Sequence, residues 1–222
     1  MKICLTVNSS PWSKFKGGGQ LAVHQLACAL STLGQEVHVV YSKCKEEIFD
    51  IEVPYKIHWA RHHNVATINL NIFSYLSVLR PLAAKEQFDI IHGNAEEAYY
   101  ADVVAREIGA DYVFTSHAPN IPQTGMLGGL TNPLQFMKTI NTYLLRESIC
   151  SAKRIVTFSQ FSRDVVVTAI GKNFIDRVEI VYPGIDPSWL EIKRNSVSSF
   201  HLLFWGRIED EKGLPELFKA IK

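Results

Sequence analysis

The stretch KICLTVNSSPWSKFKGGGQLAVHQLACALSTLG, residues 2–34, decides the fold. Its first six residues are mostly apolar and rich in branched side chains, as in a strand buried on both faces of a parallel sheet. From Gln20 onward, apolar residues recur every three or four positions, which predicts an amphipathic helix that Gly34 ends in a left-handed conformation. The residues expected to share its buried face are Ala22, Leu26, Ala29, Leu30 and Leu33.

Three consecutive glycines, Gly17, Gly18 and Gly19, stand where this helix begins. Glycine lets the backbone approach a ligand closely, and the unpaired N–H groups of the first helical turn favour an anion such as a diphosphate. The alternative is a flexible loop whose glycines serve only turn geometry. Because a strand, a loop and a helix follow one another here, we interpret the turn as an anion or sugar site.

A dinucleotide-binding fold is the main rival interpretation, since Gly17, Gly19 and Ala22 satisfy the spacing G-x-G-x-x-A. That motif should follow the first strand directly, whereas residues 9–16 intervene. The next expected strand, residues 36–41, is followed by Ser42-Lys43 and carries no acid for a ribose hydroxyl. An NAD-dependent oxidoreductase is therefore disfavoured.

Composition describes an ordinary soluble protein of one large or two small domains: 222 residues, 47% of them hydrophobic and 20% charged. A formal net charge of +1 gives no reason to expect nucleic acid as a partner. No apolar run reaches membrane-spanning length, and the amino terminus lacks the features of a signal peptide. The four cysteines form no close pair, which is typical of a reducing cytoplasm, so a cytoplasmic location is expected.

Strands and helices alternate along the chain. After the first unit, strands are expected at 36–41, 55–59, 88–92, 112–116, 154–158 and 178–182, and helices at 72–84, 95–108, 133–150 and 161–170. Pro81 is expected to kink or end the first of these helices, and Gly109 to close the second. The pattern predicts an α/β fold with a doubly wound, mainly parallel Rossmann-like sheet, whose ligands lie beyond the carboxyl ends of the strands.

A domain boundary is expected near the carboxyl end, where turn residues and a polar segment follow the last strand. We assign residues 1–192 to the first domain, 193–199 to a linker and 200–222 to the start of an incomplete second domain. That start consists of one strand, 200–205, and one helix from Leu214. One strand and one helix cannot bury a core of their own.

Two segments carry candidate site residues. His117 ends the strand 112–116, where it can exchange a hydrogen bond with a sugar hydroxyl or serve only the structure. Arg207 and Lys212 stand on a glycine-bounded loop and can converge on one diphosphate. The same loop carries three acids, so a solvated turn is the alternative. Ser159 is expected to cap the helix that follows it.

A metal site is disfavoured. His58, His62 and His63 are close in sequence, but no carboxylate or cysteine stands at a useful spacing from them.

Several motifs, in this order, resemble those of the retaining glycosyltransferases of family 4. They are Gly17-Gly18-Gly19-Gln20, Leu26-Ala27-Cys28-Ala29-Leu30, Gly34-Gln35-Glu36-Val37, Asp89-Ile90-Ile91-His92, Thr115-Ser116-His117, Ser159, Pro183-Gly184-Ile185-Asp186 and Gly206-Arg207 with Lys212-Gly213. The resemblance implies the GT-B architecture of two facing Rossmann-like domains, with a nucleotide-sugar donor held mainly by the second and an acceptor mainly by the first. It implies no metal or other cofactor.

Site roles follow from the same resemblance. His117 is expected to contact the donor sugar, and Arg207 and Lys212 to clamp the donor diphosphate. The expected substrate-binding residues are Gly17, Gly18, Gly19, Gln20, Asn94 and Ser159. Gln20, Gln35 and the pair Gly93-Asn94 depart from the family's usual residues, which leaves the acceptor unidentified.

The expected function is transfer of a sugar from a nucleoside diphosphate sugar to an acceptor. In that interpretation the base-binding segments lie beyond Lys222, so this chain alone is expected to be inactive and to need a carboxyl-terminal domain or a partner subunit. A non-catalytic or half-site module that binds an acceptor or a partner is the alternative. Residues 118–131 are a candidate acceptor lid or, less favoured, a membrane-surface patch that would make the protein peripheral at the inner face of a membrane.

Overall fold

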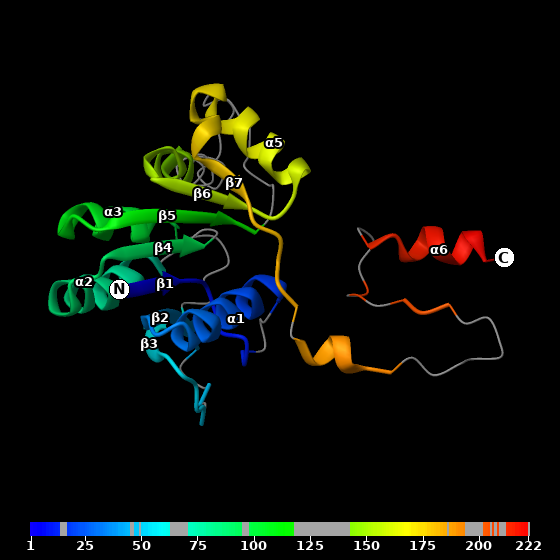
Figure 1. Cartoon of the computed structure of the whole chain (residues 1–222), viewed down its shortest axis with the longest axis horizontal. Coiled ribbons are helices and arrows are strands. Elements are labelled where there is room, and N and C mark those ends of the chain that lie inside the picture. Colours follow the sequence, from blue (N-terminus) through cyan, green and yellow to red (C-terminus); the bar gives the residue numbers. More distant parts are fainter. Residues whose placement is uncertain are drawn as a thin grey trace, which may run out of the picture. The chain divides into compact units, whose positions relative to one another are not determined.

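A sheet of seven parallel strands forms the centre of the computed structural model (Figure 1). The strands are β1 (Lys2–Thr6), β2 (Glu36–Lys43), β3 (Lys56–Arg61), β4 (Ile90–Asn94), β5 (Asp111–Ser116), β6 (Arg154–Thr157) and β7 (Val178–Ile180). They are ordered β3-β2-β1-β4-β5-β6-β7, so the winding direction reverses between β1 and β4. This confirms the predicted doubly wound parallel sheet and puts its switch point beside the first strand.

The structure describes residues 1–13, 17–44, 47–48, 50–62, 71–94, 98–117, 143–185, 187–193, 202–204, 206, 208 and 212–221. Within these residues the chain divides into two compact units, Met1–Pro183 and Gly184–Lys222. Most of the predicted linker, and the whole of the predicted lid at 118–131, lie outside the described residues. The boundary predicted after residue 192 stays a prediction.

Helices cover both faces of the sheet. Those of the first unit are α1 (Gly18–Thr32), α2 (Asn71–Glu86), α3 (Ala98–Ile108), the helical residues 143–151, α5 (Gln160–Ile170) and a 3₁₀ helix (Lys172–Arg177). Successive side chains of β1 enter two different cores: Leu5 packs in the cluster that contains residues of α1, and Cys4 in the cluster that contains residues of α2, α3 and α5. Helices α2, α3 and α5 therefore lie on the face opposite α1.

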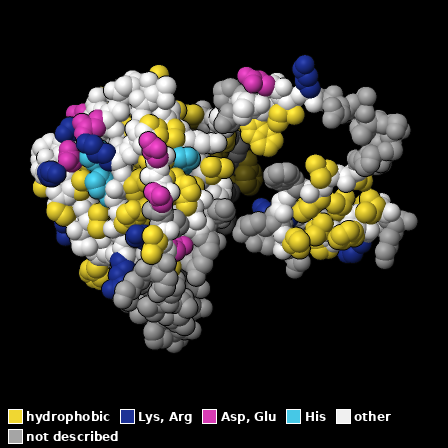
Figure 2. All heavy atoms as spheres, turned by 90° about the horizontal axis from the view of Figure 1, so that it is seen from below, with side chains coloured by type: hydrophobic (Ala, Val, Ile, Leu, Met, Phe, Trp, Pro, Cys, Tyr) yellow, Lys and Arg dark blue, Asp and Glu magenta, His cyan; other side chains and the backbone are white. Residues whose placement is uncertain are grey.

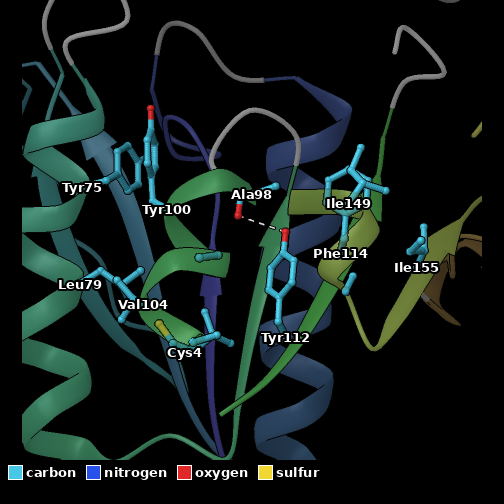
Figure 3. Close-up of a cluster of buried hydrophobic side chains, with 14 of the residues drawn as sticks. Cys4, Tyr75, Leu79, Ala98, Tyr100, Val104, Tyr112, Phe114, Ile149 and Ile155 are labelled. Atoms are coloured by element: carbon cyan, nitrogen blue, oxygen red, sulfur yellow. Dashed lines mark hydrogen bonds between the residues drawn. The ribbon is translucent and has the colours of Figure 1, made fainter. Parts of the chain in front are cut away.

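The larger core is built around buried tyrosine and aliphatic side chains between the sheet and helices α2 and α3 (Figure 3). Tyr112 is buried there, and its hydroxyl donates to the carbonyl oxygen of Ala98 at 3.1 Å. Gly93 of β4 lies so close to α3 that a Cβ atom on it would come within 2.7 Å of the Ala98 Cα. The absence of a side chain at Gly93 thus allows α3 to pack directly on β4.

The buried face of α1 differs from the prediction. Val23 and Ala27 are its buried residues, whereas Ala29 is exposed and Leu33 is 74% exposed. Apolar residues lie on two neighbouring stripes of this helix, and spacing alone does not decide between them. The small side chain of Ala27 lets the helix approach the sheet. Gly34 has φ +77°, which confirms the predicted left-handed end.

Pro81 does not end α2, contrary to one predicted outcome, because the helix continues to Glu86. Tyr75, Leu79 and Ala83 are all fully buried and lie four residues apart, so the same face packs on the sheet before and after the proline. This packing offsets the backbone hydrogen bond that proline cannot make.

The second unit contains a 3₁₀ helix (Pro187–Glu191) and α6 (Leu214–Ala220). The predicted helix from Leu214 is thus present, whereas residues 202–204 of the predicted strand have no regular secondary structure. This unit exposes many apolar side chains: Trp189, Leu190, Ile192, Leu202, Leu203, Ile208, Phe218 and Ile221. Figure 2 shows hydrophobic side chains at several places on its surface. So short a segment does not bury its own apolar surface.

Two further predictions are tested by the described residues. All four cysteines are free, as predicted from their spacing. Among the described helices, none is long and apolar enough to cross a membrane.

Candidate functional site

The candidate site lies at the carboxyl ends of the strands that flank the switch point. Asn94 is the last residue of β4, and His117 follows the last residue of β5. In the sheet register, Thr6 of β1 lies opposite Gly93, and Asn94 lies opposite Thr115. The ends of β1, β4 and β5 therefore meet at one edge, which is where doubly wound sheets bind their ligands.

Helix α1 begins at this edge. Its N-cap residue, Gly17, has no side chain that could cap the first turn, and no acidic residue lies within that turn. Gly17 and Gly18 are exposed, and a Cβ atom on Gly18 would meet nothing within 4 Å. The first N–H groups of such a helix start can receive an anion, and the predicted anion or sugar site at the glycine turn stays a prediction.

The structure brings His117 against this helix start. A Cβ atom on Gly19 would lie 3.5 Å from both Cγ and Nδ1 of the His117 imidazole, so the ring lies directly beside the glycine turn. On another side, the ring of Phe158 meets the imidazole edge to face, with 5.2 Å between the centroids. The glycine turn and His117, which are about a hundred residues apart in sequence, therefore form one site.

Asn94 determines which nitrogen of His117 carries the proton. Its amide nitrogen donates to the carbonyl oxygens of Thr6 at 3.1 Å and His92 at 3.3 Å, which leaves Oδ1 to face His117 Nε2 at 2.8 Å. Since Oδ1 can only accept, Nε2 must be the protonated nitrogen. In the neutral ring Nδ1 is then an acceptor, and it is the nitrogen nearest Gly19.

Both histidines of the site are neutral near pH 7. Burial lowers the pKa of His117 to about 4. Burial, and then the proximity of His117, lower the pKa of His92 to about 4. The His92 ring is held by a 2.6 Å hydrogen bond between Nε2 and the Thr115 hydroxyl. The two histidines therefore offer neutral hydrogen-bonding groups beside the start of α1.

Gln20 connects the glycine turn to the end of β1. Its amide nitrogen donates to Oδ1 of Asn8, and its Oε1 would lie 3.2 Å from a Cβ atom on Gly17. The loop that follows Asn8 is also attached to β2, because the Ser9 N–H donates to the Ser42 hydroxyl at 3.1 Å. Ser9 has φ +40°, an unusual conformation for a residue other than glycine.

The remaining predicted site residues are Ser159, Arg207 and Lys212. The Ser159 hydroxyl accepts from the Ser162 N–H at 3.1 Å, which confirms the predicted cap of α5, and its role toward a substrate stays a prediction. Arg207 lies outside the described residues. Lys212 is exposed in the second unit, and the proposed clamp stays a prediction.

Sequence reasoning missed Asn8 as a site residue and gave no role to His92, Thr115 or Phe158. Asn8 could have been found, because a polar residue directly after a buried parallel strand lies at the ligand-binding edge. The pairing of His92 with Thr115 depends on strand register, which spacing along the chain does not reveal.

Comparison with known proteins agrees with this geometry. The sequence profile of glycosyltransferase family 4 matches residues 16–189, which span the glycine turn and every strand after β1. The chain belongs to this family. No curated protein sequence gives a significant match.

Solved structures share the fold at low sequence identity. A sucrose-phosphate synthase from Thermosynechococcus elongatus superposes with a TM-score of 0.61 and 13% identity, over 86% of this chain and 53% of that one. A UDP-GlcNAc 2-epimerase from Methanocaldococcus jannaschii gives 0.52 and 12%, over 82% and 45%. A lipopolysaccharide outer core galactosyltransferase gives 0.52 and 12%, also over 82% and 45%. The chain thus spans about half the length of these proteins, and the Rossmann-like sheet of the predicted GT-B architecture is confirmed.

Proposed function

We propose that this chain forms the acceptor-side half of a retaining glycosyltransferase, which transfers a sugar from a nucleoside diphosphate sugar to an acceptor. The observation that carries the proposal is the meeting of the glycine turn with His117 at the switch point of the sheet. Membership of glycosyltransferase family 4 supports the reaction class. The names of the structural neighbours describe sugar or nucleotide-sugar chemistry, which supports the donor class.

The start of α1 supplies the electrostatic part of this function. Leaving-group departure puts negative charge on the diphosphate, and helix N–H groups that already point at that charge stabilise it without reorganisation. The first turn contains no acidic residue that would weaken this stabilisation. Exposed Gly18 has no side chain to keep a phosphate from the backbone.

His117 supplies recognition of the sugar. With its proton on Nε2, it offers Nδ1 as an acceptor to a sugar hydroxyl near Gly19. The low pKa keeps this lone pair available throughout the neutral pH range. Asn94 is the positioning residue, because its three hydrogen bonds fix the orientation of the imidazole.

The second half of the donor site is proposed to come from Arg207 and Lys212 together with segments that this chain does not contain. Arg offers a forked contact to phosphate and Lys a point charge. Donor transfer is proposed to need no metal, since these cations and the helix dipole take the place of a divalent ion on the diphosphate. Without the missing contacts, each worth roughly 0.5 to 1.5 kcal/mol, the chain alone should bind a donor only weakly and transfer nothing.

Calorimetric titration of the 222-residue chain with a panel of nucleoside diphosphate sugars tests the site. We expect a weak donor affinity that His117→Ala abolishes and that His58→Gln, a matched histidine change on β3, leaves intact. Equal binding by the wild-type chain and by His117→Ala would contradict the site.

Transfer itself is tested on the polypeptide extended by a complete second domain. We expect transfer to an acceptor with the anomeric configuration of the donor retained, read by NMR of the product. Inversion would remove the retaining assignment, and turnover or micromolar affinity by the 222-residue chain would show that the second half is not required.

A further inference from the structure

A second cluster of potential ligand atoms lies at the opposite edge of the sheet, where β1, β2 and β3 begin. Glu36 and His38 are both on β2, and Glu86 is the last residue of α2. One ligand atom from each side chain lies within 4.8 Å of the other two. Spacing along the chain does not reveal this cluster, because Glu86 is 48 residues from His38.

We propose that Glu36, His38 and Glu86 bind a divalent transition-metal ion of the Zn²⁺ class, at a site separate from the sugar-transfer site. One imidazole nitrogen and two carboxylate oxygens form a donor set that Zn²⁺ accepts, with water in the fourth position. Metal–ligand bonds of about 2.0–2.2 Å require ligand atoms roughly 3.3 Å apart. His38 Nε2 and Glu36 Oε1 already lie 3.3 Å apart. Only a small movement of Glu86 is needed.

The surroundings of the three ligand side chains suit the approach of their donor atoms to one ion. The His38 side chain is only 1% exposed, and the ring of Phe88 packs edge to face on it with 5.0 Å between the centroids. The two glutamates have 38% and 15% of their side chains exposed. A rigid imidazole and two adaptable carboxylates thus surround the proposed ion.

His58 completes the arrangement from outside the ligand set. Its Nε2 lies 3.0 Å from His38 Nδ1, so His38 can donate its Nδ1 proton to His58 and turn the lone pair of Nε2 toward the carboxylates. Histidines that bind metal commonly donate their other N–H in this way.

Three lysines now pair with the carboxylates and would have to be displaced: Lys2, Lys56 and Lys85, whose Nζ lies 3.7 Å from Glu86 Oε1. Lys56 Nζ lies 2.7 Å from Glu36 Oε1, and Lys2 Nζ lies 3.2 Å from Glu86 Oε2. Their side chains are 58% and 39% exposed, and ion pairs at such exposure are weak. The ammonium groups can swing into water when an ion binds. The alternative is that these side chains form only a network of ion pairs at the surface. The two interpretations differ in whether removal of a lysine raises the affinity for Zn²⁺.

Isothermal titration of the 222-residue chain with ZnCl₂ near pH 7 tests the proposal. We expect one site in the micromolar range that Glu36→Gln and Glu86→Gln each weaken at least about tenfold. Both glutamates are partly exposed, so these variants should fold. Glu107→Gln, which removes an exposed carboxylate paired with Arg80, is the matched control and should bind Zn²⁺ as the wild-type chain does.

Lys56→Met gives the sharper test, because it removes the cation that lies 2.7 Å from Glu36 Oε1 and leaves the three ligands. The proposed site should then bind Zn²⁺ several-fold more tightly. Absence of binding up to about 1 mM, affinities unchanged by both glutamate substitutions, or no gain in affinity with Lys56→Met would each overturn the proposal. Circular dichroism of every variant verifies that it is folded.

Discussion

Asn94→Ala is the substitution that most directly tests how the candidate site is held together. The side chain is 1% exposed and makes three hydrogen bonds, to the carbonyl oxygens of Thr6 and His92 and to His117 Nε2. Alanine removes all three and leaves the Nε2–H of His117 without this acceptor. No other described residue bonds to that nitrogen.

The expected loss of stability follows from those bonds. A net contribution of roughly 0.5 to 1.5 kcal/mol for each hydrogen bond, reduced for the long 3.3 Å contact, gives a free energy of unfolding lower by about 1–4 kcal/mol. For a protein of this size, that corresponds to a melting temperature lower by roughly 2–16 °C. The imidazole should also lose its preference for the Nε2 proton.

Urea denaturation and ¹⁵N NMR of the histidine ring measure these two effects. Asn173→Ala is the control, because Asn173 is exposed in the 3₁₀ helix Lys172–Arg177, and it should change stability by no more than about 0.5 kcal/mol. A loss below about 1 kcal/mol for Asn94→Ala, or a His117 ring still protonated on Nε2, would refute the proposed positioning role of Asn94.

Three further predictions concern stability. Gly93→Ala should lower the free energy of unfolding by about 1–3 kcal/mol, because the added Cβ would lie 2.7 Å from a backbone atom of α3. Gly18→Ala, where the added Cβ meets open space, should raise the free energy of unfolding by up to about 1 kcal/mol. Urea denaturation that ranks the two variants the other way would contradict the packing described. Ser159→Ala should cost about 1 kcal/mol and speed amide exchange in the first turn of α5, and unchanged exchange there would show that the cap is not used. The contribution of the buried histidines to stability should be complete well above pH 6.5 and should be lost progressively as the pH falls from about 7 to about 4, because histidines with a folded pKa of about 4 stay neutral while those of the unfolded chain take up protons. Denaturation midpoints across this range should show a slope of up to three protons, and a flat profile would mean that the histidines are not buried as described. The histidines concerned are His58, His92 and His117.

Local pattern was sufficient for the class of fold. Short runs of branched apolar residues alternate with segments of helical spacing, and only a parallel sheet with crossover helices accommodates that order. The helix ends at Gly34 and Gly109, where φ is positive, could also be predicted, because glycine adopts the left-handed conformation at little cost. The buried stripe of α1 and the course of α2 past Pro81 were not, since both depend on what packs against the helix.

The sequence by itself determined that a glycine-bounded helix start and a histidine at a strand end would be present, because each is a property of a few adjacent residues. Only the tertiary structure decided that Gly19 and His117 are neighbours, that Asn94 orients the imidazole, and that His38 meets Glu36 and Glu86 at the far edge. Strand order and register bring these residues together. They are set by the burial of both faces of the whole sheet, which no short stretch of the chain contains.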